Sequence, residues 1–133
     1  MSRVTIIDNE YLTLWYHPEK KIVHHKLHKF LFGKVLREGL DEGIKLLKEY
    51  EAQKWLSDDK NNFGMTKEDT TWTYTDWFPR AVQAGWKYWA LVRPEKVIGQ
   101  MSMRQIIKDC AASGVTVQVF SDSEAAMKWL EEQ

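Results

Sequence analysis

Early in the chain, the spacing of apolar residues changes from a period of two to a helical period. Residues 3–7, 11–17 and 20–27 are short β-rich runs separated by the turn-forming segments DNE and PEK. This spacing predicts an antiparallel meander. Over residues 33–50 apolar side chains recur every three or four positions, with Lys and Glu between them, and this pattern predicts a helix.

Two glycines, Gly39 and Gly43, lie one turn apart inside that predicted helix. Each costs about 1 kcal/mol relative to Ala in a helix interior. We therefore expect a close packing surface to compensate for them.

The second half of the chain alternates predicted strands with predicted helices. The strands lie at residues 53–57, 86–92 and 115–120. Each precedes a helix that a capping box opens, and the boxes begin at Thr66, Ser102 and Ser121. Pro79 is expected to kink or restart the first of these helices. Such alternation predicts parallel strands joined by right-handed crossovers.

The whole pattern predicts a single α/β domain over residues 1–133. Its core is one mixed β-sheet, with an N-terminal antiparallel meander, parallel C-terminal strands and helices packed against it. No linker or low-complexity segment interrupts the pattern.

Polar loops follow three of the predicted strands, at residues 57–62, 93–95 and 121–123. In open α/β sheets, ligands bind beyond the carboxyl ends of the parallel strands, so these loops are expected to converge. A helix cap needs only one polar residue, whereas the first loop has six. We interpret it as a candidate recognition loop, formed by Ser57, Asp58, Asp59, Lys60, Asn61 and Asn62.

The segment TWTYTDWFPRAVQAGWKYWALV, residues 71–92, concentrates aromatic side chains. Most of them are expected in the core, and any ring left exposed would form a surface for a partner or a ligand. The residues of this candidate pocket or partner surface are Trp72, Trp77, Arg80, Trp86, Arg93 and Ser121.

The amino-acid composition argues against some classes of function. Nineteen Lys and Arg balance nineteen Asp and Glu, so no net field favours a nucleic acid. No run of about 18 apolar residues predicts a membrane span, and a single cysteine excludes an internal disulfide. These features favour a cytoplasmic protein.

Catalytic and cofactor motifs are missing from the sequence. It has no P-loop, GxGxxG, GxSxG or CxxC pattern, so we expect no cofactor. On a strand His24 and His28 would lie roughly 13 Å apart, and His25 would point to the opposite face. No metal site is therefore predicted there. Cys110 lies on the apolar stripe of its helix and is expected to be a buried thiol.

The order of elements, together with KWLSDDKNN, WFPRAVQAGWKYWALV and FSDSEAAMKWL, resembles the small bacterial STAS-like proteins, relatives of the anti-sigma-factor antagonists. The resemblance covers nearly the whole chain as a pattern of elements. It implies a four- or five-stranded mixed sheet and a functional loop between a central strand and the next helix.

The phosphorylated antagonists carry in that loop an Asp, then a Ser or Thr that accepts phosphate, then Ser-Gly. The matching positions here are Asp58 followed by Asp59, so the phosphate acceptor and the glycine are both missing. Some STAS-like proteins also resemble CRAL-TRIO lipid-binding domains, which implies an apolar pocket as an alternative.

The sequence favours a non-enzymatic regulatory or protein-interaction module of STAS-like type. Residues 57–62 and the neighbouring helix would then be presented to a protein partner. The alternative is binding of a small apolar or lipid-like ligand, with Trp72, Trp77 and Trp86 as walls. A homodimer, in which a second subunit covers exposed tryptophans, is also left open.

An enzyme is the third hypothesis. In it Asp58 or Asp59 would act as a general base, and Arg93 would steady an anionic substrate. The sequence offers no recognisable nucleophile to support this reading.

Overall fold

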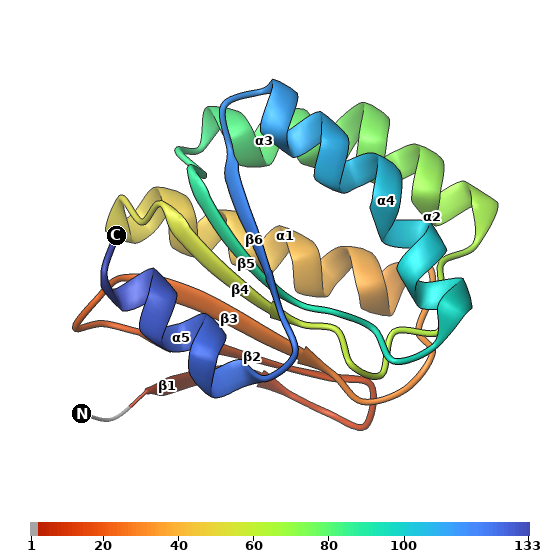
Figure 1. The fold of residues 1–133 in the computed structure, drawn as a ribbon, viewed down its shortest axis with the longest axis horizontal. Coiled ribbons are helices and arrows are strands. Elements are labelled where there is room, and N and C mark those ends of the chain that lie inside the picture. Colours follow the sequence, from red (N-terminus) through yellow and green to blue (C-terminus); the bar gives the residue numbers. More distant parts are fainter. Residues whose placement is uncertain (1–2) are drawn as a thin grey trace.

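The strands lie side by side in chain order in one six-stranded sheet (Figure 1). The computed structural model describes residues 3–133. The strands are β1 (Val4–Asp8), β2 (Leu12–His17), β3 (Ile22–Leu27), β4 (Lys54–Asp58), β5 (Tyr88–Val92) and β6 (Thr116–Phe120). The first three pair antiparallel, and β3 to β6 pair parallel. The predicted α/β fold with one mixed sheet is confirmed, with six strands where the resemblance implies four or five.

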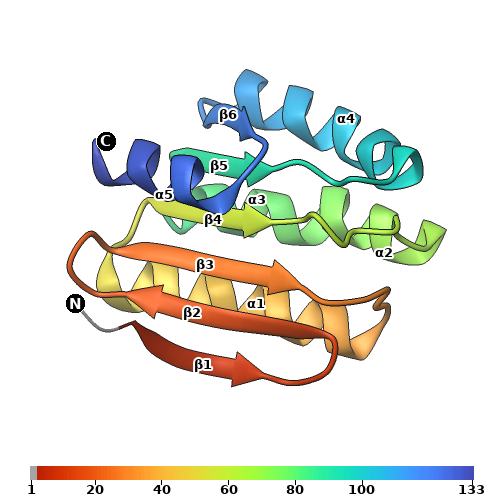
Figure 2. The same ribbon diagram turned by 60° about the horizontal axis from the view of Figure 1, so that its bottom comes forward.

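Helices cover both faces of this sheet, and Figure 2 shows α5 in front of it with the other helices behind. One face carries α1 (Lys34–Tyr50), α4 (Val97–Ala112) and the continuous segment of α2 (Lys67–Trp72), η1 (Thr73–Trp77) and α3 (Phe78–Gln83). The other face carries α5 (Ser123–Glu131). None of the helices within residues 3–133 has the length and apolarity needed to span a bilayer.

Two separate cores result, because successive residues of a strand point to opposite faces. On β4, Trp55 joins the large core beneath α1, η1 and α4, whereas Leu56 joins the small core beneath α5. The same alternation continues beyond these residues, so Ser57 and Asp59 lie on the side of the large core.

The glycines of α1 lie where the helix approaches the sheet most closely. A Cβ atom at Gly43 would overlap the indole ring of Trp55, and one at Gly39 would come within 2.9 Å of a Leu12 methyl carbon. The expected close packing surface is confirmed. Gly43 leaves the space that the large Trp55 ring occupies.

Two predicted capping boxes are wrong, while the one at Thr66 is confirmed. The Thr66 hydroxyl accepts the Asp69 N–H at 3.1 Å. Helix α4 begins at Val97, before the expected cap at Ser102, and in its first turn a Cβ atom at Gly99 would overlap the carbonyl oxygen of Asn62, which is remote in sequence. There the Gln100 side chain donates to the Pro94 carbonyl at 2.9 Å.

The cap of α5 is Asp122 rather than Ser121. Asp122 has extended backbone angles, and its carboxylate accepts the Ala125 N–H at 2.8 Å. Gly85 follows the end of α3 and adopts a φ of 112°, a conformation that favours glycine.

Candidate functional site

The three polar loops meet at one edge of the sheet, because β4, β5 and β6 are adjacent and parallel. Backbone hydrogen bonds join them there. The Asp59 N–H donates to the Val92 carbonyl at 3.1 Å, and the Glu95 N–H donates to the Lys60 carbonyl at 3.1 Å. Arg93 and Ser121 are exposed, and neither lines the cavity that Ser57, Asp59 and Asn62 line.

Most of the recognition loop is buried. Ser57, Asp58, Asp59 and Asn62 are buried, Asn61 is half-buried, and Lys60 is exposed. The two aspartates diverge, since Asp59 lines a cavity beneath the helices and Asp58 is on the α5 side of its strand. A carboxylate facing the interior of the large core is the main polar feature of the site.

Asp59 forms a buried pair with His25 of β3. The His25 Nε2 atom lies 2.7 Å from Asp59 Oδ1, and both side chains are buried. The indole Nε1–H of Trp55 donates to His25 Nδ1 at 3.0 Å. Because an indole nitrogen is only a donor, Nδ1 is the acceptor, and the single ring proton of His25 is on Nε2. His25 therefore donates to Asp59.

Asn62 constrains the second oxygen of Asp59. The Gly64 N–H donates to Asn62 Oδ1 at 2.7 Å, which orients the amide so that its Nδ2 lies 3.4 Å from Asp59 Oδ2. Both oxygens of Asp59 thus act as acceptors, which is the pattern of an ionised carboxylate. The bond from Asn62 to Asp59 Oδ2 is long and therefore weak, so Oδ2 can still accept a hydrogen bond from another donor.

A cavity of about 80 Å³ lies between the sheet and the helices of the large core. Its polar lining is small, comprising His25, Ser57, Asp59, Asn62 and Thr73. Its aromatic lining is Trp55, Trp77, Trp86 and Trp89. A single water needs roughly 10–15 Å³ by a comparable measure, so the space exceeds one water several-fold.

Two residues that line the cavity have incompletely satisfied donors. The Nε1–H of Trp86 is buried and has no hydrogen-bond partner in the described part of the chain. The Ser57 hydroxyl accepts from Trp89 Nε1 at 2.8 Å, and within residues 3–133 no acceptor takes its proton. Buried polar groups are normally paired. These two groups therefore have hydrogen-bonding capacity that the protein itself does not use.

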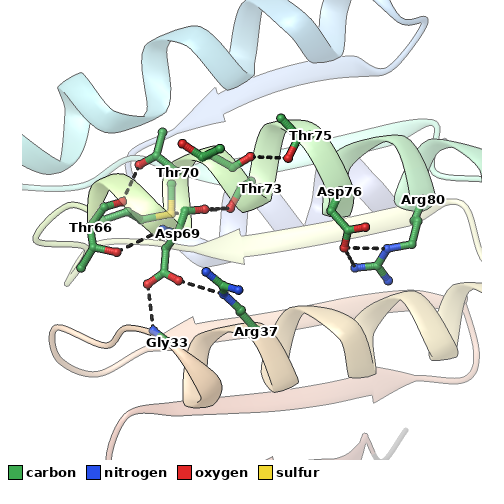
Figure 3. Close-up of polar contacts among 11 residues, drawn as sticks. Gly33, Arg37, Thr66, Asp69, Thr70, Thr73, Thr75, Asp76 and Arg80 are labelled. Carbon is green, nitrogen blue, oxygen red and sulfur yellow. Dashed lines mark hydrogen bonds and ion pairs between the residues drawn. The ribbon is translucent and has the colours of Figure 1, made fainter.

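The helical wall opposite the sheet is fixed by Asp69, which Figure 3 shows reaching from α2 to the start of α1. Its carboxylate accepts the Gly33 N–H at 2.8 Å and the Arg37 Nε–H at 3.1 Å. Burial by itself raises the pKa of Asp69, but these hydrogen bonds outweigh it and hold the pKa below its usual value. Asp69 is therefore a structural link between the helices.

The π-helical turn η1 delivers Trp77 to the cavity. The Thr73 hydroxyl donates to the Asp69 carbonyl at 2.8 Å, and Pro79 follows in the first turn of α3. Because proline has no N–H, the regular helical bonding is interrupted there, as expected from the sequence. Trp77 Nε1–H then donates to the Leu40 carbonyl at 2.9 Å, which holds its ring against α1.

The aromatic residues named from sequence separate into two groups. Trp77 and Trp86 are buried and line the cavity, whereas Trp72 is half-buried on the outer side. The guanidinium carbons of Arg37 and Arg80 lie 5.1 and 5.8 Å from the centroid of the Trp72 ring. Trp72 thus belongs to a surface cluster with two arginines.

His24, His25 and His28 have three different surroundings. His24 and His25 point to opposite faces of β3, and His28 Nε2 lies 2.7 Å from the Thr13 hydroxyl. Within residues 3–133 no group of three or more His, Cys, Asp or Glu side chains could hold a metal ion. The thiol of Cys110 is buried, which raises its pKa to about 12, so it is protonated at neutral pH.

His25, Trp55 and Trp89 are the site residues that the sequence did not single out. His25 and Ser57 are register partners on β3 and β4, and Trp55 and Trp89 are partners on β4 and β5. The available signal was alternation, which puts these side chains on one face once the strand order is known.

Comparison of the chain with protein-family models, with curated proteins and with solved structures finds no match. The site is therefore interpreted from its own geometry.

Proposed function

We propose that the protein binds a small ligand in the cavity of the large core. The observation that carries this proposal is a largely apolar cavity, large enough for more than one water, that has the buried Asp59 carboxylate in its lining and borders Trp86, whose buried Nε1–H is unpaired in the described part of the chain. Ligand sites are typically apolar concavities with a few well-placed polar groups, and this cavity has that composition. His25 and Ser57 come from the adjacent strands β3 and β4, and Asp59 directly follows β4.

Burial argues for this function over recognition of a protein partner by residues 57–62. Ser57, Asp58, Asp59 and Asn62 are all less than a tenth exposed. A partner docking on the surface would reach mainly Lys60. The regulatory module of STAS-like type stays a prediction, and the buried half of its loop is better placed to contact a ligand.

Direct catalysis by His25 is disfavoured by its hydrogen bonds. Nδ1 is occupied by Trp55 and Nε2 by Asp59. Neither ring nitrogen is free to take a proton from a substrate. The function supported best is therefore binding without a chemical step at His25.

The test is intrinsic tryptophan fluorescence during titration with small polar and amphiphilic compounds, with ethanolamine, propanol and choline as the first probes. Four tryptophans line the cavity, so occupancy should change emission and raise the melting temperature. Leu36→Phe, which puts a larger side chain into the cavity wall, should abolish the response.

The control is Val119→Phe, which adds the same ring at an exposed position of β6 outside the cavity lining. It should respond as the unmodified protein does. A response that survives Leu36→Phe would place binding elsewhere and contradict the proposed function.

A further inference from the structure

The cavity contains a negative charge that its lining does not neutralise. Asp59 is only 3% exposed and accepts hydrogen bonds through both oxygens. Its partner His25 has a single proton, because Trp55 donates to the other ring nitrogen. The pair therefore has a net charge of about −1, since a neutral imidazole cannot offset a carboxylate.

No lysine or arginine in the described part of the chain is placed in the cavity lining to compensate for this charge. An ionised group in an apolar site is strongly destabilised unless it is paired. A cation bound beside Asp59 would supply that pairing.

The walls of the cavity suit an organic cation. Trp55, Trp77, Trp86 and Trp89 form a connected aromatic cluster, with neighbouring ring centroids 5.5 to 5.9 Å apart. All four rings line the cavity. Cations are attracted to the faces of tryptophan rings, and aromatic walls recognise alkylated ammonium groups in this way.

A metal ion is a poorer fit than an organic cation. Zinc sites use at least three protein ligands, and residues 3–133 offer no such group of His, Cys, Asp and Glu. Both nitrogens of His25 are already bonded, which removes the natural partner ligand of Asp59.

The unpaired Trp86 N–H adds a second requirement. It is a donor, so the molecule that satisfies it must present an acceptor atom. An ammonium group alone cannot, but a hydroxyl oxygen on the same molecule can.

From these groups we infer that the ligand is a small organic ammonium ion that also carries a hydroxyl or similar acceptor. Its positive end pairs with Asp59, its alkyl groups contact the tryptophan rings, and its oxygen accepts from Trp86. This inference rests on the proposed function, because it concerns the same cavity.

The test compares pairs of probes that have nearly the same shape but differ in charge. Ethanolamine is compared with propanol, and choline with its uncharged analogue, in which a tert-butyl group replaces the trimethylammonium group. Titrations follow tryptophan fluorescence at pH 7 and constant ionic strength. In the unmodified protein each cation should bind about 10- to 30-fold more tightly than its neutral counterpart.

Asp59→Asn should reduce cation binding to the level of the neutral probe and leave the neutral probe unchanged. The matched control is Asp58→Asn, since Asp58 is also buried but lies outside the cavity lining. It should keep the preference for the cations. Asp58→Asn variants that lose the preference as fully as Asp59→Asn would overturn the assignment to Asp59.

The two proposals fail in different ways. Neutral probes that bind as tightly as the cations, in a manner blocked by Leu36→Phe, would overturn the inference and leave the proposed function intact. Failure of every probe to bind would overturn both. The comparison of probes in the unmodified protein is decisive even if Asp59→Asn does not fold.

Discussion

The two faces of the sheet are built from the same strands, yet they are packed in different ways. The face beneath α5 is a small aliphatic core of Ile22, Leu56, Ala90, Val92, Ala126 and Leu130, each with no exposed surface. The opposite face is larger, rich in tryptophan, and includes a cavity with a buried carboxylate. Protein interiors normally have few voids larger than a water molecule, so the cavity on the aromatic face is unusual for a core. The aliphatic face serves stability, and the aromatic face has space for a ligand.

The sharpest test of this comparison is removal of a leucine from each face. Leu130→Ala, on the α5 face, should lower the free energy of unfolding by about 2–5 kcal/mol, because the lost atoms leave a new void in a filled core. Leu36→Ala, on the cavity face, should cost less, about 2 kcal/mol or below, because Leu36 already borders empty space.

Chemical denaturation of the two variants measures both costs. Equal losses would show that the two faces are packed equally well. The cavity would then have no detectable effect on the free energy of unfolding.

A smaller effect is expected from His24, the neighbour of His25 on the other face. Burial, and next the nearby His17 and His25, lower the pKa of His24 to about 3. In the unfolded chain the value is about 6.5, so protonation favours unfolding. The stabilisation is complete above pH 6.5 and is lost as the pH falls from there towards 3. Between pH 7 and pH 5 the loss should be about 2 kcal/mol.

Denaturation at the two pH values checks this effect, with His24→Gln as the variant that cannot titrate. The variant should be less sensitive to pH by about the same 2 kcal/mol. A pH dependence as steep as that of the unmodified protein would show that His24 is not the group responsible.

The smallest effect is expected outside both cores, at Arg80. Its guanidinium group bonds Asp76 at 2.7 Å and Asp41 at 2.8 Å, and all three side chains are at least a third exposed (Figure 3 shows the bond to Asp76). Arg80→Ala should cost less than about 1 kcal/mol, and the cost should shrink in 1 M salt.

Arg80→Lys is the control, since it keeps the charge but cannot bridge two carboxylates as a planar guanidinium does. It should lie between Ala and Arg. A loss as large as that of Leu130→Ala would mean that the helix layer depends on its surface charges.

Much of the fold could be predicted because it follows from local patterns. Alternation defines the strands, helical spacing defines α1, and the Thr66 box marks the start of α2. The start of α4 could not be predicted, because its first turn depends on contacts of Gly99 with the backbone of Asn62, which is remote in sequence. No local pattern records those contacts.

The site could be located but not described from sequence. The loop at residues 57–62 is at the expected edge, yet a polar loop has the same composition whether its side chains are exposed or buried. The contact of Trp55 with His25 joins residues 30 positions apart and depends on the register of two parallel strands. Only the three-dimensional pairing reveals which aspartate faces the cavity.

Gly43 has a consequence far from its own helix. Any side chain there would displace the Trp55 indole, and that indole determines which nitrogen of His25 is protonated. The residue types at positions 43, 55 and 25 therefore depend on one another. A glycine of α1 thus determines which ring nitrogen of His25 is protonated, and so which nitrogen faces Asp59.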